Sequence, residues 1–135
     1  MTKHSTHALP ALLLALALPM AAQAAAANGA ASKQIATAAA HAGMAMGAAD
    51  LATAHAHLHH VVNCLVGPSG KGFDAKAENP CKGMGHGAIV DAKGDVATVD
   101  RLNAALGQAE HGLKETALDA VHADAKQVME TLQAK

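Results

Sequence analysis

The sequence predicts an all-α protein, a four-helix bundle made of two antiparallel helical hairpins joined by a long glycine-rich loop. Three observations support this fold class. Apolar residues recur at steps of three and four in the segments expected to be helical. Alanine, the strongest helix former, dominates the hydrophobic residues, which make up 51% of the chain. Seven of the 12 glycines lie between residues 67 and 95, where they separate the two hairpins.

Residues 1–24 have the features of a secretory signal peptide. Residues 1–4 are weakly basic, residues 8–22 are apolar, and Ala22-Gln23-Ala24 matches the small-x-small pattern that signal peptidase recognises. The apolar run is shorter than the about 20 residues that a membrane span needs. We therefore expect cleavage near Ala24 and export to the periplasm or out of the cell. Residues 25–135 are then expected to form one soluble helical domain with no membrane partner.

The charge balance argues against nucleic acid as a partner. The chain has 10 basic and 11 acidic residues, and loss of Lys3 with the signal peptide would leave 9 and 11, a net charge of −2 with histidine neutral. This composition provides no basic patch for phosphates, and an aromatic content of 1% provides few rings for stacking on bases. An alanine-rich core is also thin, so a disulfide or a bound metal is expected to add stability.

The first hairpin is expected to follow a frayed lead-in over residues 25–31. Ser32 is a suitable N-cap for its first helix. Gly43–Gly47 then either forms the hairpin turn or weakens one long helix. The next helix is expected over residues 48–66, with Gly67-Pro68 as its stop signal. Its apolar stripe consists of Leu51, Ala54, Leu58, Val61 and Leu65.

Cys64 and Cys81 flank the first part of the long loop over residues 67–95. Two cysteines in an exported protein most often pair. A disulfide would close a loop of about 17 residues and stabilise the fold by about 3 kcal/mol on the chain-entropy model. The alternative is a reduced pair of thiolates that binds metal. The two interpretations compete, because a disulfide removes both sulfurs as strong ligands.

The second hairpin follows this loop. Its first helix is expected over residues 96–110, and His111-Gly112 ends it. The residues of its apolar stripe are Val99, Leu102, Leu106, Ala109 and Leu113. Thr116-Ala117-Leu118-Asp119 resembles a capping arrangement and predicts a fourth helix that runs to the C-terminus. The stripe of this fourth helix consists of Leu118, Val121, Ala125, Val128 and Leu132.

The second and fourth predicted helices align without a gap when Leu51 is placed on Leu118. Five residues are identical in this alignment: Leu51 and Leu118, His55 and His122, Ala56 and Ala123, Val61 and Val128, and Leu65 and Leu132. His41 and His111 also correspond if three residues are inserted in the first copy. We interpret this as a duplicated hairpin, with chance agreement between two alanine-rich helices as the alternative. Because short turns join antiparallel neighbours, His41 and His111 are expected at one end of the bundle.

Histidines gather on the second predicted helix, where four of the ten lie within residues 55–60. His57 and His60 lie on one flank of the apolar stripe, with Asp50 two turns before His57, and His55 and His59 lie on the other. Imidazole is a preferred ligand of zinc, copper and nickel, and pairs at these spacings can chelate one ion. The alternative is a solvated polar border. The candidate metal ligands are His41, Asp50, His55, His57, His59, His60, His111 and His122.

Four short segments carry a resemblance to a known family: Ala40-His41-Ala42, Ala54-His55-Ala56, Glu110-His111-Gly112 and Val121-His122-Ala123. In these segments the chain resembles the small histidine-rich periplasmic metal-binding proteins, which are four-helix bundles. The resemblance covers residues 33–66 and 96–134. It implies binding of copper and other divalent metals through surface histidines, and a role in metal buffering or tolerance. The loop between Cys64 and Cys81 is not part of the family pattern.

The sequence therefore predicts an exported protein that binds a divalent transition metal, with copper favoured by the general order of affinities and zinc or nickel also compatible. The alternative is a non-catalytic, disulfide-stabilised helical module that contacts another periplasmic protein. An enzyme is not expected, because a disulfide would remove the Cys64 nucleophile and no oxyanion-stabilising motif accompanies it. Covalent haem attachment is not expected either, since the chain has no Cys-x-x-Cys-His motif.

Overall fold

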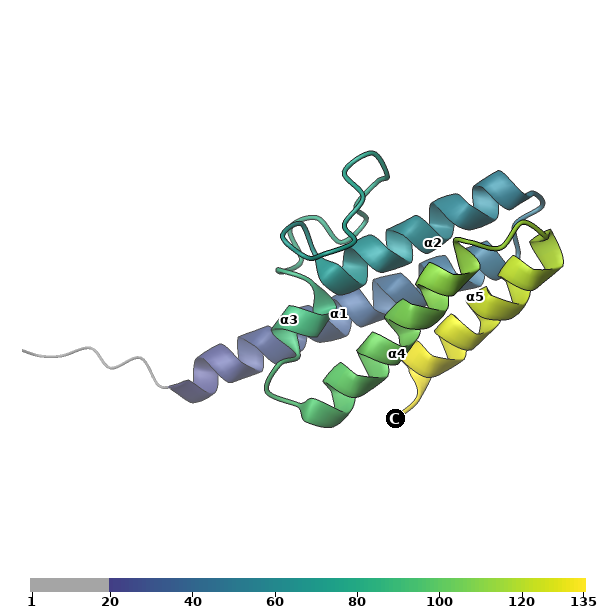
Figure 1. Cartoon of the computed structure of the whole chain (residues 1–135). Coiled ribbons are helices and arrows are strands. Elements are labelled where there is room, and N and C mark those ends of the chain that lie inside the picture. Colours follow the sequence, from purple (N-terminus) through teal and green to yellow (C-terminus); the bar gives the residue numbers. More distant parts are fainter. Residues whose placement is uncertain (1–19) are drawn as a thin grey trace, which may run out of the picture.

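The computed structural model describes residues 20–135 of the chain, which contain five helices and no strand (Figure 1). Residues 1–19 of the predicted signal peptide lie outside the described part, and cleavage near Ala24 stays a prediction. The helices are α1 (Met20–Met46), α2 (Leu51–Val66), α3 (Ala88–Asp91), α4 (Val96–Gly112) and α5 (Leu118–Gln133). None of the helices within residues 20–135 combines the length and apolar character that crossing a membrane requires.

The four long helices form the predicted bundle. α1 packs against α2 and α5, and α4 packs against α5 and α2. The two helices of each packed pair run antiparallel. The two hairpin turns lie at the same end of the bundle (Figure 1). The segment between α2 and α4 lies at the opposite end and includes the short helix α3, which the sequence did not predict.

The core is thin because α1 contributes mainly alanine to it. Ala38, Ala42 and Ala45 have no exposed surface, and they belong to the same core as larger side chains of the other helices such as Leu58 and Leu102. Small side chains allow close approach of two helix backbones but bury little apolar area. The predicted stripes of α2 and α5 are confirmed as core. Their fully or almost fully buried members are Ala54, Leu58, Val61, Leu65, Val121, Ala125, Val128 and Leu132.

The prediction that the first helix starts at Ser32 was wrong, because α1 already begins at Met20. Ser32 lies inside the helix, where its hydroxyl donates to the carbonyl oxygen of Asn28 at 2.8 Å instead of capping. The alanine-rich stretch before it has enough helix propensity to need no cap at that point. α1 ends at Met46, so a hairpin turn follows and the alternative of one long helix to Val66 is excluded.

Asp50 is the N-cap of α2, which begins slightly later in the chain than we predicted. Its carboxylate accepts hydrogen bonds from the Thr53 amide and the Thr53 hydroxyl, both at 2.8 Å, which stabilises the first turn. The predicted stop at Gly67 is confirmed, since this residue has φ 71°, a conformation that favours glycine. A side chain at Gly67 would also collide with the backbone of His86, which crosses there.

The two hairpins share more than their apolar stripes. The alignment that places Leu51 on Leu118 also places Val66 on Gln133, so both ends of α2 coincide with both ends of α5. The starts of the two helices differ in chemistry. Ala117 occupies the N-cap of α5 and no side chain caps that helix, so the predicted capping arrangement at Thr116–Asp119 was wrong. The aspartate in the first turn, Asp119, still places a negative charge near the positive end of the helix dipole.

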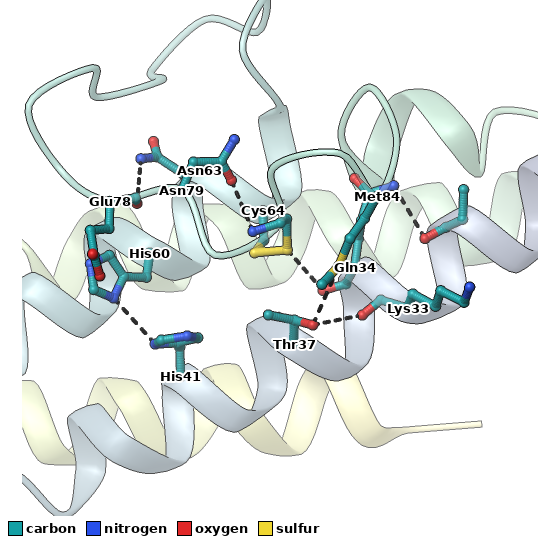
Figure 2. Close-up of a disulfide and its surroundings, with 12 residues drawn as sticks. Lys33, Gln34, Thr37, His41, His60, Asn63, Cys64, Glu78, Asn79 and Met84 are labelled. Carbon is teal, nitrogen blue, oxygen red and sulfur yellow. Dashed lines mark hydrogen bonds between the residues drawn. A yellow bond between two sulfur atoms is a disulfide. The ribbon is translucent and has the colours of Figure 1, made fainter.

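Cys64 and Cys81 form the predicted disulfide, with their Cα atoms 5.2 Å apart. Neither cysteine is free, so the alternative of a metal-binding thiolate pair is excluded in this structure. The bond joins the last turn of α2 to the segment after it (Figure 2).

Candidate metal centre

Three histidines from α1 and α2 meet at the boundary between these helices. The Nδ1 atom of His41 lies 3.1 Å from Nδ1 of His57 and 3.2 Å from Nδ1 of His60. The three ring centroids are 4.8–5.5 Å apart, so each ring is close to both others. All three side chains are partly exposed, which leaves an entry path for an ion. We call His41, His57 and His60 the histidine trio.

The trio arises from one helical spacing and one close helix pair. His57 and His60 are three residues apart on α2 and therefore project from the same flank of its apolar stripe. α1 runs antiparallel to α2 and packs against it, and α1 contributes small buried side chains such as Ala38 and Ala42 to the core. This packing brings His41 within reach of both rings (Figure 2 shows His41 facing His60).

The distances from His41 to His57 and His60 are close to those in the coordination sphere of a small transition-metal ion. Metal–nitrogen bonds of about 2.0–2.1 Å in a tetrahedral site place neighbouring ligand nitrogens about 3.3–3.4 Å apart. The two Nδ1···Nδ1 distances of 3.1 and 3.2 Å are close to that value. The group could therefore hold a metal ion with small adjustments of the side chains.

Hydrogen bonding alone does not account for this arrangement. The Nδ1 atom of a neutral imidazole carries either one hydrogen or one in-plane lone pair. His41 can therefore make one good hydrogen bond through Nδ1, yet two Nδ1 atoms lie close to it. An ion at the centre of the trio would accept a lone pair from all three nitrogens at once.

The local electrostatics keep two members of the trio, His41 and His60, in the ligand-competent state. Burial lowers the pKa of His41 below its ordinary value, and the neighbouring His60 and His57 lower this pKa further. Burial followed by the charge of His57 likewise lowers the pKa of His60. Both imidazoles are thus neutral at pH 7, which is the form that binds metal.

A second group of possible ligands lies on the other hairpin and consists of His111, Glu115 and Asp124. The Nδ1 atom of His111 is 2.9 Å from an oxygen of Asp124, while its Nε2 atom is 3.7 Å from an oxygen of Glu115. The two carboxylates thus lie beside different nitrogens of the His111 ring. The hydrogen bond and charge of Asp124 raise the pKa of His111, so this group favours an imidazolium held between two carboxylates.

The remaining predicted ligands are separate from the trio. His59 faces Asp74 at 3.3 Å, and Nε2 of His122 lies 2.9 Å from the carbonyl oxygen of Ala48 in the first hairpin turn. Asp50 caps α2 instead of facing an ion. Nε2 of His55 is buried and has no hydrogen-bond partner among the described residues. His41 and His111 lie near the hairpin turns at one end of the bundle, but they belong to different groups.

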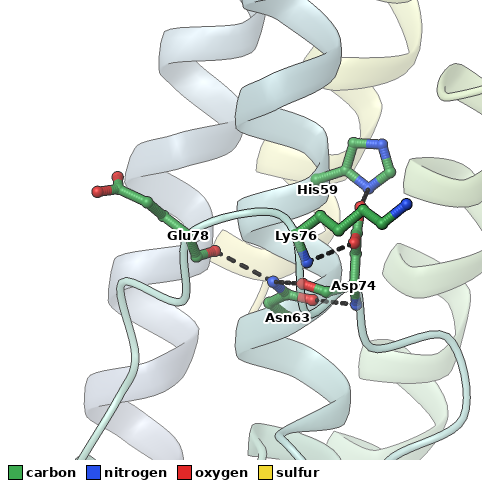
Figure 3. A network of polar contacts seen from close by, with 5 residues as sticks. All are labelled: His59, Asn63, Asp74, Lys76 and Glu78. Atoms are coloured by element: carbon green, nitrogen blue, oxygen red, sulfur yellow. Dashed lines mark hydrogen bonds and ion pairs between the residues drawn. The ribbon is translucent and has the colours of Figure 1, made fainter.

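Sequence reasoning missed a buried side chain that organises the surroundings of the trio. Asn63 has no exposed surface, and its amide group binds the backbone of the following segment at three points. Its Nδ2 donates to the carbonyl oxygens of Asp74 and Glu78 at 3.0 and 3.1 Å, and its Oδ1 accepts from the Asp74 amide at 2.8 Å (Figure 3). A polar residue within the apolar last turns of α2 was the available signal.

A groove of ≈600 Å³ lies elsewhere, between α1, α4 and α5. Ile35, Met129 and Leu132 form apolar parts of its wall, and Arg101 contributes a positive charge. None of the candidate metal ligands lines it. The groove and the trio are therefore separate features of the bundle.

Fold and site together describe a helical bundle with a group of histidines that could hold a metal ion. Comparison of the chain with protein-family models, with curated proteins and with solved structures found no match.

Proposed function

We propose that this protein binds a divalent transition-metal ion through His41, His57 and His60, and that it acts outside the cytoplasm as a metal buffer. The observation that supports the proposal most directly is the pair of Nδ1···Nδ1 contacts at 3.1 and 3.2 Å, which suits an ion better than it suits hydrogen bonds. Copper(II), zinc(II) and nickel(II) all accept imidazole nitrogen, and copper(II) binds most tightly in the general order of affinities.

The exposure of the site supports buffering and transfer more than permanent retention. Three imidazoles leave at least one coordination position for water or another ligand, and the partly exposed side chains leave a path for exchange. The resemblance of the His41, His55, His111 and His122 segments to periplasmic metal-binding bundles points to the same role. The disulfide agrees with an oxidising compartment.

Isothermal titration calorimetry with Cu(II), Zn(II) and Ni(II) tests the proposal. We expect at least one of these ions to bind with a Kd below about 100 μM, equivalent to about 5.5 kcal/mol. The triple variant His41→Gln, His57→Gln, His60→Gln is expected to lose this binding. His86→Gln is the matched control, because its side chain is 87% exposed and lies outside the trio.

Two results would contradict the proposal. The first is the absence of binding tighter than about 100 μM for all three ions. The second is undiminished binding by the triple variant, which would move the site to other histidines. Circular dichroism of the triple variant is expected to show an intact helical fold, so that a loss of binding reports the loss of ligands and not of structure.

A further inference from the structure

We propose that Glu78 supplies a carboxylate ligand to the ion held by the histidine trio, and that the segment over residues 74–81 positions it. This inference rests on the proposed function and names one more residue of the same site. We call residues 74–81 the strap, because the segment crosses α2 and is attached to it at several points. The carboxylate would make the site selective for divalent ions over copper(I).

The strap is held against α2 by bonds at both of its ends and near its middle. Cys81 is bound covalently to Cys64 of α2, and within the strap the Asn79 side chain accepts a hydrogen bond from the Cys81 amide at 3.0 Å. Asn63 binds the backbone of Asp74 and Glu78 (Figure 3). A buried amide is costly unless it is paired, so these three bonds hold the strap in one path.

This attachment places Glu78 near the trio through adjacent residues of α2. Asn63 follows His60 by three residues, so the two side chains are neighbours on the helix surface. Asn63 donates to the carbonyl oxygen of Glu78, which fixes the backbone of Glu78 close to His60. Figure 2 shows the Glu78 side chain beside His60.

The Glu78 carboxylate is available for an ion. Its side chain is exposed, and no described residue forms a hydrogen bond or ion pair with it. Its negative charge raises the pKa of both His41 and His60, whereas burial lowers the pKa of these two rings. At the trio, the ligand atoms of described residues that lie within 4.8 Å of one another come from the three imidazoles, so the carboxylate must rotate toward them to bind.

A carboxylate would change which ions the site prefers. Three neutral imidazoles bind zinc(II), copper(II) and copper(I), whereas a carboxylate oxygen is a hard ligand that favours the more highly charged ions. Its negative charge also neutralises part of the charge of a divalent ion at the partly buried trio, where an uncompensated charge is unfavourable. Loss of the carboxylate should therefore weaken binding of divalent ions and leave copper(I) binding nearly unchanged.

The test compares the full chain with its Glu78→Gln variant. Zn(II) affinity is expected to fall at least about tenfold, the lower end of the losses seen when a group that supports a metal site is removed. Cu(I) affinity, measured anaerobically against a colorimetric chelator, is expected to change less than about twofold. Glu130→Gln is the matched control, since it removes an exposed carboxylate of α5 that pairs with Lys126, far along the chain from the trio.

Cobalt(II) gives a second measurement that does not depend on affinity. The d–d absorption of the Co(II)-loaded protein is expected to differ between the wild type and Glu78→Gln, because one oxygen ligand is replaced. Equal Zn(II) affinities or identical Co(II) spectra would overturn the role of Glu78 while leaving the trio as the metal site. Failure of the wild type to bind Zn(II), Cu(II) or Ni(II) would instead overturn the proposed function itself.

Discussion

His57 and Asp124 stand at equivalent places in the two hairpins, and each faces the histidine that precedes its hairpin turn. His57 faces His41, and Asp124 faces His111. Where an imidazole is replaced by a carboxylate, the pKa of the facing histidine shifts in the opposite direction. The pKa of His41 is lowered by burial and by its two imidazole neighbours, whereas the pKa of His111 is raised beside Asp124.

The first prediction concerns the charge state of His111. Its pKa in the folded protein is expected above 6.5 because Asp124 stabilises the imidazolium. NMR titration of the imidazole signals measures this pKa directly. Asp124→Asn should lower it toward the ordinary value. A pKa of His111 at or below 6.5 in the wild type would contradict the ion-pair interpretation.

A stability consequence follows for the same pair. Since the folded-state pKa of His111 is raised, the stabilisation is fully present below pH 6.5 and is lost as the pH rises through the folded-state pKa. The effect is expected to be small, because the His111 side chain is 65% exposed and solvent screens the pair. Urea unfolding of the wild type and of Asp124→Asn should therefore differ more at pH 5.5 than at pH 8.

The second prediction concerns the histidine trio in acid. The folded-state pKa values of His41 and His60 are lowered, so their contribution to stability is present above pH 6.5 and is lost as the pH falls through those values. Metal binding should follow the same protonation. The midpoint of Zn(II) loss is expected below pH 6.5, where an ordinary imidazole is already half protonated. A pKa of His41 or His60 above 6.5, measured by NMR titration of the metal-free protein, would contradict the lowered pKa values.

The third prediction uses the duplication of the hairpin. His57 and His60 correspond to Asp124 and Gln127 in the alignment of α2 with α5. The double variant Asp124→His, Gln127→His should therefore create a second trio with His111. Calorimetry is expected to show two ions bound where the wild type binds one. The single variant Gln127→His is the control, and an unchanged stoichiometry in the folded double variant would argue against equivalent geometry.

The fourth prediction concerns the disulfide. The double variant Cys64→Ala, Cys81→Ala should lower the free energy of unfolding by about 3 kcal/mol, because the denatured chain regains the entropy of the open loop. Urea unfolding monitored by circular dichroism measures this loss. A reducing agent should lower the unfolding midpoint of the wild type and leave that of the variant unchanged. Equal midpoints for the oxidised wild type and the variant would contradict a stabilising role.

Local patterns in the sequence predicted the helices, whereas contacts between distant segments did not follow from them. The apolar periodicity around Leu58 and Val128 was sufficient to predict helices and their buried faces, because helical spacing is a local property of the chain. Gly67 and the cysteine pair were also informative. Glycine is the residue that best tolerates a positive φ at a helix end, and two cysteines in an exported protein most often form a disulfide. The start of α1 was mispredicted because alanine extends a helix without any boundary signal.

The identity of the candidate site depended on contacts between helices. The sequence placed His57 and His60 on one flank of α2, but it could not show that His41 of α1 faces this flank. That contact depends on how closely the two helices pack and on the side of α1 that is turned toward α2. The roles of Asn63 and Glu78 likewise depend on the path of the strap, which no periodicity describes. His55 and His122 coincide in the repeat, yet His122 binds the Ala48 carbonyl while Nε2 of His55 finds no such partner among the described residues. Periodicity thus predicts which face of a helix a residue occupies, whereas packing of distant segments decides what that residue meets.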